Sequence, residues 1–355
     1  TEHLQLKRVG RRWTGLCPFH TEKSPSFSVN GEEGLYYCFG CGAGGNAIGF
    51  LMEYERLDFP AAVEKLAGIA GVDVPREGGA PGASPRQAEL ASRLEAAAKW
   101  FQAQLRSHPQ AAQARQYLEG RGLSEETIQR FGIGFAPPGW DGLLTALGRS
   151  EADRMLLLDA GLLISRDDGG LYDRFRHRIM FPIRDNRGRA VAFGGRVLTD
   201  EKPKYLNSPE TAIFHKSQEL YGLFEARRTV RDLDRVLVVE GYMDVVMLAQ
   251  HGINNAAGTL GTSLTANHLQ RLYRYTPGVV FCFDGDEAGR KAAARALEIA
   301  LPAMQDGRQA SFLFLPEGED PDSLVQRIGA DAFRKLLSTA TPLSEYVFEH
   351  YGHAI

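Results

Sequence analysis

Three cysteines and one histidine near the N-terminus constrain the fold of this 355-residue chain more than any other feature. They form two pairs, Cys17-x2-His20 and Cys38-x2-Cys41. Two tight turns at this spacing can present three thiolates and an imidazole to one tetrahedral Zn2+ ion. Because four protein ligands leave no position for water, the sequence predicts one structural zinc ion. The alternative is that these thiols carry no metal.

The segments around the two pairs alternate apolar and polar residues at 26–29 and 35–38, which is typical of strands. We therefore expect the metal to hold a β-ribbon that is too small for a large core. The glycines at 40–45 favour a metal-binding turn over a phosphate loop, because their spacing matches neither nucleotide fingerprint. Cations and aromatics mix here, as in single-strand-binding surfaces, although ribbon packing explains them equally: Arg11, Arg12, Trp13, Lys23, Phe27, Tyr36 and Phe39.

Composition excludes several classes of protein. No run reaches the roughly 18 consecutive apolar residues of a membrane helix, and the first residues show no secretory signal. The 41 basic and 44 acidic residues exclude a uniformly basic nucleic-acid coat, although local patches remain open. Four cysteines are too few for a disulfide scaffold, so we expect a reducing, cytosolic environment.

The chain divides by composition and hydrophobic pattern into five segments. A ribbon domain is expected over 1–74, followed by a linker at 75–87, where six of thirteen residues are Pro or Gly. Helical spacing and then short extended runs predict a helical and antiparallel-sheet subdomain over 88–234. An α/β core is expected over 235–325, and 326–355 would begin a helical segment. The overall class is α+β.

Three short apolar strands are expected in the α/β core, at 236–239, 279–283 and 312–315. Helical stretches separate them, which favours a parallel, Rossmann-like sheet. Acidic residues follow each strand: Glu240 and Asp244, then Asp284 and Asp286, then Glu319, Asp320 and Asp322. Parallel neighbours would bring these groups to one edge of the sheet, where such sheets bind ligands.

Carboxylates gathered at one edge would repel one another, by about 4 kcal/mol for each pair at 4 Å and an effective dielectric of 20. Divalent cations would offset this repulsion. Oxygen ligands favour Mg2+ or Mn2+, and several acids suit a two-metal site for phosphoryl transfer. The alternative is that the acids only cap helices.

A basic stretch precedes the core: residues 174–204 hold nine basic and three acidic side chains, which indicates an anionic ligand. On a strand, Arg174, Arg176 and Arg178 would line one face along a phosphate backbone, unless they form an ordinary solvated face. Lys216 is equally consistent with an anion site and a surface lysine. The residues assigned to nucleic-acid or nucleotide binding are Arg130, Arg174, Arg176, Arg178, Arg196, Lys204, Tyr205, Asn207 and Lys216.

The assembled motifs resemble the bacterial DnaG-type primase family over nearly the whole chain. The strings are Cys17–His20, Glu22–Phe27, Tyr37–Gly42, Arg130–Gly134, Arg178–Arg184, Pro203–Pro209, Glu240–Asp244, Asp284–Asp286 and Asp320–Asp322. The resemblance implies a zinc domain that reads single-stranded template and an RNA polymerase domain built around a Toprim fold. It implies that Glu240, Asp284 and Asp286 are catalytic, with Glu240 favoured for proton transfer, and that two or more Mg2+ or Mn2+ ions bind Glu240, Asp244, Asp284, Asp286, Asp320 and Asp322.

The same resemblance implies a DNA primase, a DNA-directed RNA polymerase that makes short RNA primers on single-stranded DNA from ribonucleoside triphosphates. Lys204, Asn207 and Lys216 would contact nucleotide or template phosphates. We expect the chain to stop inside a helical tail, before a domain that binds the replicative helicase. A single-strand-binding protein is a further candidate partner, and the expected location is the bacterial cytoplasm at the replication fork.

Three other functions are weighed against this interpretation. A topoisomerase or Toprim nuclease shares the Glu and Asp-x-Asp pattern, but a topoisomerase also needs a tyrosine nucleophile in another domain, and none is evident. A non-catalytic single-strand-binding or recombination-mediator protein would keep the acids for fold or metal alone. A fused helicase–primase is disfavoured because the sequence lacks a Gly-x4-Gly-Lys-Ser/Thr string.

Overall fold

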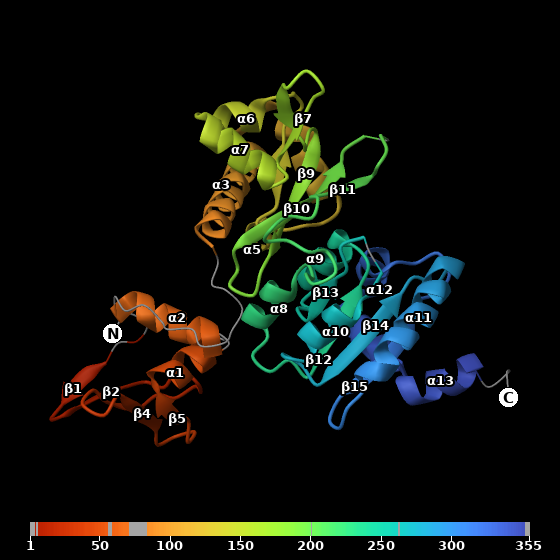
Figure 1. Cartoon of the computed structure of the whole chain (residues 1–355). Helices are drawn as coiled ribbons and strands as arrows, with labels where there is room; N and C mark the ends of the chain where they lie inside the picture. The colour runs from red at the N-terminus through yellow and green to blue at the C-terminus, as the bar shows by residue number, and fades with distance from the viewer. Residues whose placement is uncertain are drawn as a thin grey trace. The chain divides into compact units, whose positions relative to one another are not determined.

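The computed structural model has two compact units, Thr1–Gly82 and Ala83–Ile355 (Figure 1). It describes residue 4 and residues 6–55, 59–70, 84–199, 201–261 and 263–351. The predicted linker lies outside the described residues up to residue 83. Residues 85–87 belong to a helix rather than to a linker, because Ser84 and Gln87 form a capping box and Pro85 occupies the first helical position.

The first unit contains a five-stranded antiparallel sheet in the order β1-β2-β3-β4-β5, followed by two helices. Its elements are β1 (Lys7–Val9), β2 (Arg12–Gly15), β3 (Phe27–Asn30), β4 (Leu35–Cys38), β5 (Gly44–Asn46), α1 (Ala47–Tyr54) and α2 (Phe59–Ala70). Asn46 caps α1 by accepting the backbone N–H of Gly49 at 2.9 Å. Its buried cluster is small and consists of Cys17, Phe19, Phe27, Tyr36 and Cys38, and Leu51 and Ala62 are also buried in the two helices. A core of this size needs another source of stability.

The second unit begins with helices and an antiparallel sheet in the order β11-β10-β9-β6, which confirms the predicted sheet. Figure 1 shows α3 (Pro85–Ser107) lying along this sheet. The helix and the sheet pack closely, since a Cβ atom at Gly134 in β6 would lie 2.6 Å from the backbone of Phe101 in α3. The other elements are α4 (Ala112–Gly120), α5 (Glu125–Phe131), β6 (Gly134–Ala136), α6 (Gly142–Leu147), α7 (Glu151–Asp159), β7 (Leu163–Ser165), β8 (Leu171–Asp173), β9 (Arg178–Arg184), β10 (Ala190–Val197), β11 (Tyr205–Asn207) and α8 (Leu223–Thr229).

The second half of this unit is built on a mostly parallel sheet in the order β13-β12-β14-β15-β16. Only β16 of this sheet runs antiparallel, against β15. The three predicted strands are present as β12, β14 and β15, which begin one to three residues earlier than predicted, and β15 also ends one residue earlier. The elements are β12 (Arg235–Val239), α9 (Tyr242–Gln250), β13 (Ala256–Gly258), α10 (Ala266–Leu272), β14 (Gly278–Phe283), α11 (Glu287–Ala300), β15 (Gln309–Phe314), α12 (Pro321–Leu337), β16 (Thr341–Pro342) and α13 (Leu343–Tyr351).

Alternate residues of the parallel strands enter two separate cores. Leu237 and Val280 pack with the buried residues of α9 and α12, whereas Val236 and Phe281 pack with those of α10 and α11. This alternation follows from the period of two along a strand. Both faces of the sheet are therefore covered, and the carboxyl ends of the strands remain as the edge where a site can form.

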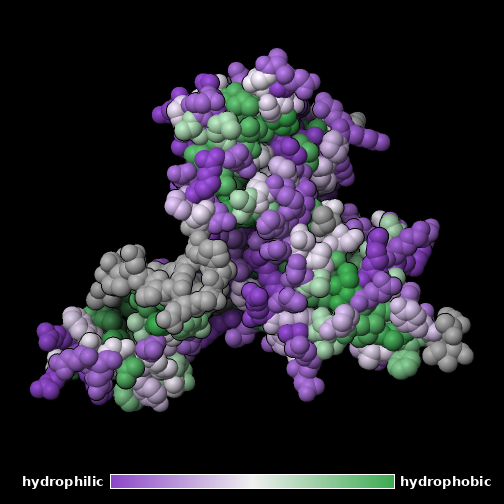
Figure 2. Space-filling view, viewed as in Figure 1, coloured by the Kyte–Doolittle hydropathy of each residue, from purple (hydrophilic) through white to green (hydrophobic). Residues whose placement is uncertain are grey.

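Hydrophilic residues dominate the visible face of the second unit in Figure 2, with small hydrophobic areas between them. Among the described helices, none combines the length and the apolar character that crossing a bilayer requires.

Candidate functional site

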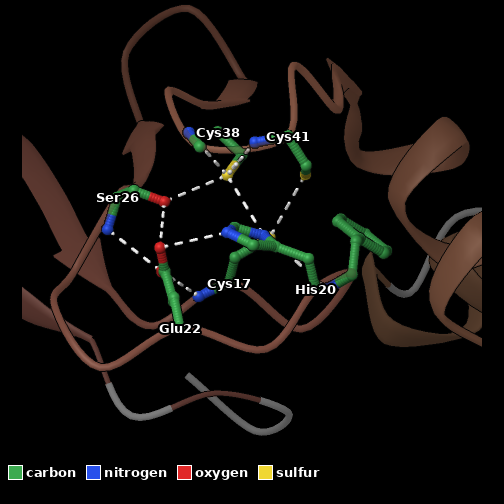
Figure 3. Close-up of polar contacts among 8 residues, drawn as sticks. Cys17, His20, Glu22, Ser26, Cys38 and Cys41 are labelled. Atoms are coloured by element: carbon green, nitrogen blue, oxygen red, sulfur yellow. Dashed lines mark hydrogen bonds and ion pairs between the residues drawn. The ribbon is translucent and has the colours of Figure 1, made fainter.

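The two Cys and His pairs come together in the first unit (Figure 3). One ligand atom from each of Cys17, His20, Cys38 and Cys41 lies within 4.8 Å of all the others. The Sγ atoms of Cys17 and Cys41 are 3.8 Å apart, and Cys38 Sγ lies 3.7 Å from His20 Nδ1. Tetrahedral bonds of ~2.3 Å to one ion would place sulfur ligands about 3.8 Å apart. The cluster therefore has both the donor atoms and the spacing of a zinc site.

Backbone N–H groups surround two of these sulfur atoms. Phe19 donates to Cys17 Sγ at 3.4 Å, and Gly40 donates to Cys38 Sγ at 3.3 Å. Burial raises the pKa of the Cys17 thiol to about 12. Burial also opposes ionisation of Cys38, but the Ser26 hydroxyl and backbone N–H groups outweigh it and lower the pKa of Cys38 to about 6. Gly40 is required by close approach, since a Cβ atom there would lie 2.6 Å from His20 Nε2.

The aromatic side chains of the ribbon separate into two groups. Phe27 and Tyr36 are buried and stacked with ring centroids 5.3 Å apart, so they belong to ribbon packing. Trp13, Tyr37 and Phe39 are exposed, and the rings of Tyr37 and Phe39 meet edge to face at 5.1 Å. Only the second group is available to stack on bases.

The acidic side chains of the second unit stand after strands or in the first turn of the following helix. Asp286 and Asp320 each accept the backbone N–H of the residue three positions on, at 2.7 and 2.6 Å, and thereby cap α11 and α12. Asp244, in the first turn of α9, accepts the N–H of Gly241 at 2.9 Å. Helix capping is therefore present, but it occupies these carboxylates only in part.

Most of these acids line one cavity of about 420 Å³ at the carboxyl edge of the parallel sheet: Glu240, Asp244, Asp284, Asp320 and Asp322. Asp286 does not line the cavity, but its charge acts on both Glu240 and Asp284. In the described ranges, the Cys and His cluster is the only set of three or more such side chains compact enough for one ion. The acids surround their cavity at wider spacing, which suits cations that keep water and substrate ligands.

Burial and mutual repulsion raise the pKa values of the cavity acids. Burial is the larger cause at Asp244, with the charges of Asp320 and Asp284 added, and the pKa rises to about 7. Burial and the charges of Glu240, Asp320 and Asp286 raise the pKa of Asp284 to about 6. Burial and the charge of Asp286 raise the pKa of Glu240, which Arg295 opposes. A bound divalent cation would offset the repulsion between these carboxylates.

Cationic side chains line the same cavity: Arg121, Arg196, Lys204 and Arg295. Arg121 Nη1 lies 2.5 Å from Oδ2 of Asp322, which is buried. Arg196 lies over the ring of Tyr117 at 4.1 Å and donates to the carbonyl of Val197. Tyr205, also in the cavity wall, stacks on Tyr242. A cavity with acids and cations together can hold a metal–triphosphate group.

The expected arginine track is wrong, because β9 begins only at Arg178 and residues 174–177 are not in a strand. Arg178 turns inward, is buried, and donates to the carbonyls of Gly195 and Pro203, each at 3.1 Å. Arg174 donates to the carbonyl of Asn207 at 3.3 Å. An alternating pattern on its own does not reveal which cations the backbone will engage.

Three other predicted nucleic-acid contacts, Arg130, Asn207 and Lys216, do not line the cavity. Arg130 donates to Asn254 Oδ1 at 3.0 Å, and Asn207 donates to the carbonyl of Leu260 at 2.6 Å. The backbone carbonyl of Lys216 lies 2.8 Å from Nε2 of the buried His268.

Sequence reasoning missed several residues. Arg121 and Arg295 line the cavity, but no local sequence pattern marks either of them. Arg121 lies 201 positions away in the sequence from Asp322, with which it pairs. Trp140 is exposed, and the guanidinium groups of Arg176 and Arg166 lie 4.3 and 5.4 Å from its ring. An aromatic flanked by arginines suits base stacking and phosphate contact.

Three known families match separate parts of the chain. The CHC2 zinc finger matches residues 1–81, the N-terminal domain of the DNA primase catalytic core matches residues 100–227, and the Toprim-like family matches residues 237–325.

Curated relatives match almost all of the chain. A DNA primase of Pseudomonas putida is 58% identical over 99% of this chain and 54% of its own length. A DNA primase of Escherichia coli K12 is 55% identical over 97% of this chain and 60% of its own length. The chain thus spans little more than half the length of these relatives.

Solved structures of DNA primases also match this chain. A DNA primase domain from Pseudomonas aeruginosa has 60% identity and a TM-score of 0.72, and covers 74% of this chain and 82% of its own. A DnaG primase catalytic domain bound to single-stranded DNA has 54% identity and a TM-score of 0.73, covering 76% and 84%. The zinc-binding and RNA polymerase domains of Aquifex aeolicus primase have 32% identity and a TM-score of 0.68, covering 99% and 84%. The chain therefore belongs to the DnaG-type DNA primase family.

Proposed function

We propose that this chain holds the zinc-binding and RNA polymerase parts of a DNA primase, which makes short RNA primers on single-stranded DNA from ribonucleoside triphosphates. The observation that carries the proposal is that strand-end carboxylates and cations line one cavity of about 420 Å³. The names of the relatives support the same activity, as does the single-stranded DNA bound to one of the related structures.

The reaction joins the 3′-hydroxyl oxygen of the growing primer to the α-phosphorus of the incoming nucleotide and releases pyrophosphate. The residues proposed to hold Mg2+ or Mn2+ are Glu240, Asp244, Asp284, Asp286, Asp320 and Asp322. Such cations would supply charge stabilisation to the attacking and leaving oxygens.

The chain's own side chains would perform the remaining tasks. Arg196 and Lys204 bind the triphosphate and offset its charge. Glu240 is exposed at the strand end and its pKa is raised, so it is the group suited to accept the proton of the 3′-hydroxyl. Arg176 and Trp140 give the template strand a place to stack outside the cavity.

The ribbon is proposed to bind one structural Zn2+ through Cys17, His20, Cys38 and Cys41. Its exposed Trp13, Tyr37 and Phe39 would contact template bases during initiation rather than bond formation. The same proposal includes two protein partners: the replicative helicase, bound through a segment outside this chain, and a single-strand-binding protein. It also places the protein in the cytoplasm, at the replication fork.

The test is a primer-synthesis assay on defined single-stranded templates with labelled ribonucleotides, in Mg2+ and in Mn2+. Asp284→Asn and Asp286→Asn should each lower the synthesis rate by about 100-fold or more, with single-strand binding within about twofold of wild type. Asp331→Asn is the matched control, because Asp331 is exposed and pairs only with Arg334 among the described contacts.

Three outcomes would count against the proposal. Synthesis retained by the Asp284 and Asp286 variants would remove the assigned role of these acids. Cleavage of phosphodiesters without added nucleotides would indicate a Toprim nuclease. Single-strand binding without incorporation in either metal would indicate a non-catalytic binding protein.

A further inference from the structure

One side chain outside the proposed zinc ligands organises the space around them. Glu22 is largely buried, with 10% of its side chain exposed, and both of its oxygens are engaged (Figure 3). Oε1 accepts the backbone N–H of Cys17 at 2.7 Å and that of Ser26 at 3.1 Å. Oε2 faces His20 Nε2 at 3.3 Å and accepts the hydroxyl of Ser26. The two oxygens therefore have different partners: Oε1 accepts from the backbone, and Oε2 contacts the side chains of His20 and Ser26.

The orientation of His20 depends on Oε2. The Nδ1 atom of His20 faces Cys38 Sγ at 3.7 Å, while Nε2 faces Glu22. An imidazole that binds a metal through Nδ1 must carry its proton on Nε2, and a carboxylate at Nε2 favours that tautomer. It also resists a flip of the ring, which would turn the protonated nitrogen toward the metal.

Ser26 links Glu22 to a second ligand. Its Oγ lies 3.1 Å from Cys38 Sγ and also bonds to Glu22. A hydroxyl has one proton, so it donates to one of the two groups at a time. A metal-bound Cys38 is a thiolate and can only accept, and Glu22 Oε1 would still hold the backbone N–H of Ser26. The hydroxyl therefore stays within reach of the sulfur.

We propose that Glu22 is a positioning residue of the zinc site, which holds His20 for ligation through Nδ1 and keeps Ser26 beside Cys38. This inference rests on the proposed zinc site. The competing account is that Glu22 only closes the 17–26 loop through Oε1. Glu22→Gln separates the two accounts, because glutamine can retain the Oε1 acceptor but places an N–H donor where Oε2 faces the N–H of His20.

The experiment uses the intact 355-residue chain and measures Zn2+ affinity by competition with a chromogenic chelator. Glu22→Gln is expected to lower the affinity by about 10- to 100-fold, the range found for outer-shell partners of metal-bound histidines. Ser26→Ala is expected to cause a smaller loss in the same direction. Glu53→Gln is the matched control, since Glu53 accepts the Tyr36 hydroxyl at 3.1 Å in the same unit, outside the cluster, and it should bind Zn2+ as wild type does.

The absorption spectrum of the Co2+-loaded chain gives a second measurement. The spectrum of Glu22→Gln should shift relative to wild type and to Glu53→Gln, because the histidine ligand is no longer held. Equal Zn2+ affinity and an unchanged spectrum in Glu22→Gln would overturn the inference. If Glu22→Gln fails to fold, wild-type affinity in Ser26→Ala would overturn it instead. Absence of Zn2+ binding by the wild-type chain would contradict the proposed zinc site itself, so the two failures are distinguishable.

Discussion

The phenol of Tyr242 donates a hydrogen bond to Oδ1 of Asn207 across 2.8 Å. Tyr242 begins α9, between Gly241 and Met243 of the acidic cavity's lining, and Asn207 ends β11 of the antiparallel sheet. The same amide donates to the carbonyl of Leu260. Asn207, which the sequence assigned to nucleotide contact, thus bridges the antiparallel sheet and the parallel-sheet half of the second unit.

Tyr242→Phe should lower the free energy of unfolding by about 1–2 kcal/mol, because it leaves Asn207 Oδ1 without its donor while the ring packing remains. Urea denaturation of the metal-free chain measures the effect. Tyr273→Phe is the control, since its hydroxyl makes one exposed bond, to the Gln309 carbonyl, and the expected change is below about 0.5 kcal/mol. Equal midpoints for wild type and Tyr242→Phe would show that the bridge contributes nothing.

Gly285→Ala should lower primer synthesis by about 10-fold or more while the chain still folds. A Cβ atom at Gly285 would lie 2.3 Å from the carbonyl oxygen of Pro316, so the Asp284 turn and the loop before Asp320 must separate. A shift of this kind moves two metal-binding candidates apart. Gly31→Ala is the control, because nothing lies within 4 Å of its added Cβ atom. Full activity in Gly285→Ala would show that the turn relaxes without disturbing the acids.

The strand-end acids could be predicted because apolar runs mark buried strands and parallel strands share a carboxyl edge. The residues Ala256–Gly258 carry little strand propensity, and this segment is a strand only because it pairs with β12, so β13 was missed. Gly285, between Asp284 and Asp286, does not have a positive φ, and close approach of the backbone is what requires glycine there.

Contacts between distant segments were the least predictable part of the site. Arg121 reaches Asp322 across 201 positions, and no local pattern marks Arg121 as the partner of this acid. Arg178 was expected on a solvent-facing track, yet it satisfies backbone carbonyls inside the protein. The Cys and His cluster of the ribbon could be predicted from the spacing of its residues, because each pair is local and the strands between the two pairs are short.

Stability of the metal-free chain should fall as pH rises from about 4 to about 7. The pKa of Asp244 is raised to about 7 and that of Asp284 to about 6, from 3.8, so the folded chain binds more protons than the unfolded chain in this window. Stability therefore decreases with rising pH. Asp244→Asn stays neutral and should be more stable than wild type by about 1–3 kcal/mol at about pH 8.

The measurement is thermal or urea unfolding in chelator across this pH range. Asp331→Asn should follow the wild-type curve, because Asp331 is exposed. A wild-type stability that increases between about pH 5 and about pH 7, with Asp244→Asn parallel to it, would contradict the raised pKa values.

Removal of metal from the ribbon should unfold the first unit and leave the second folded. Cys17 and Cys38, two of the five residues in the buried cluster of the ribbon, are proposed ligands, so loss of the ion removes both cross-links and core packing. Metal binding in small domains contributes about 10 kcal/mol, more than such a core supplies. The second unit has its own extensive cores around the parallel sheet. Limited proteolysis in chelator, with metal loss verified by elemental analysis, should therefore cleave within residues 6–70 and spare residues 84–351, whereas equal protection of residues 6–70 with and without metal would show that the ribbon folds without an ion.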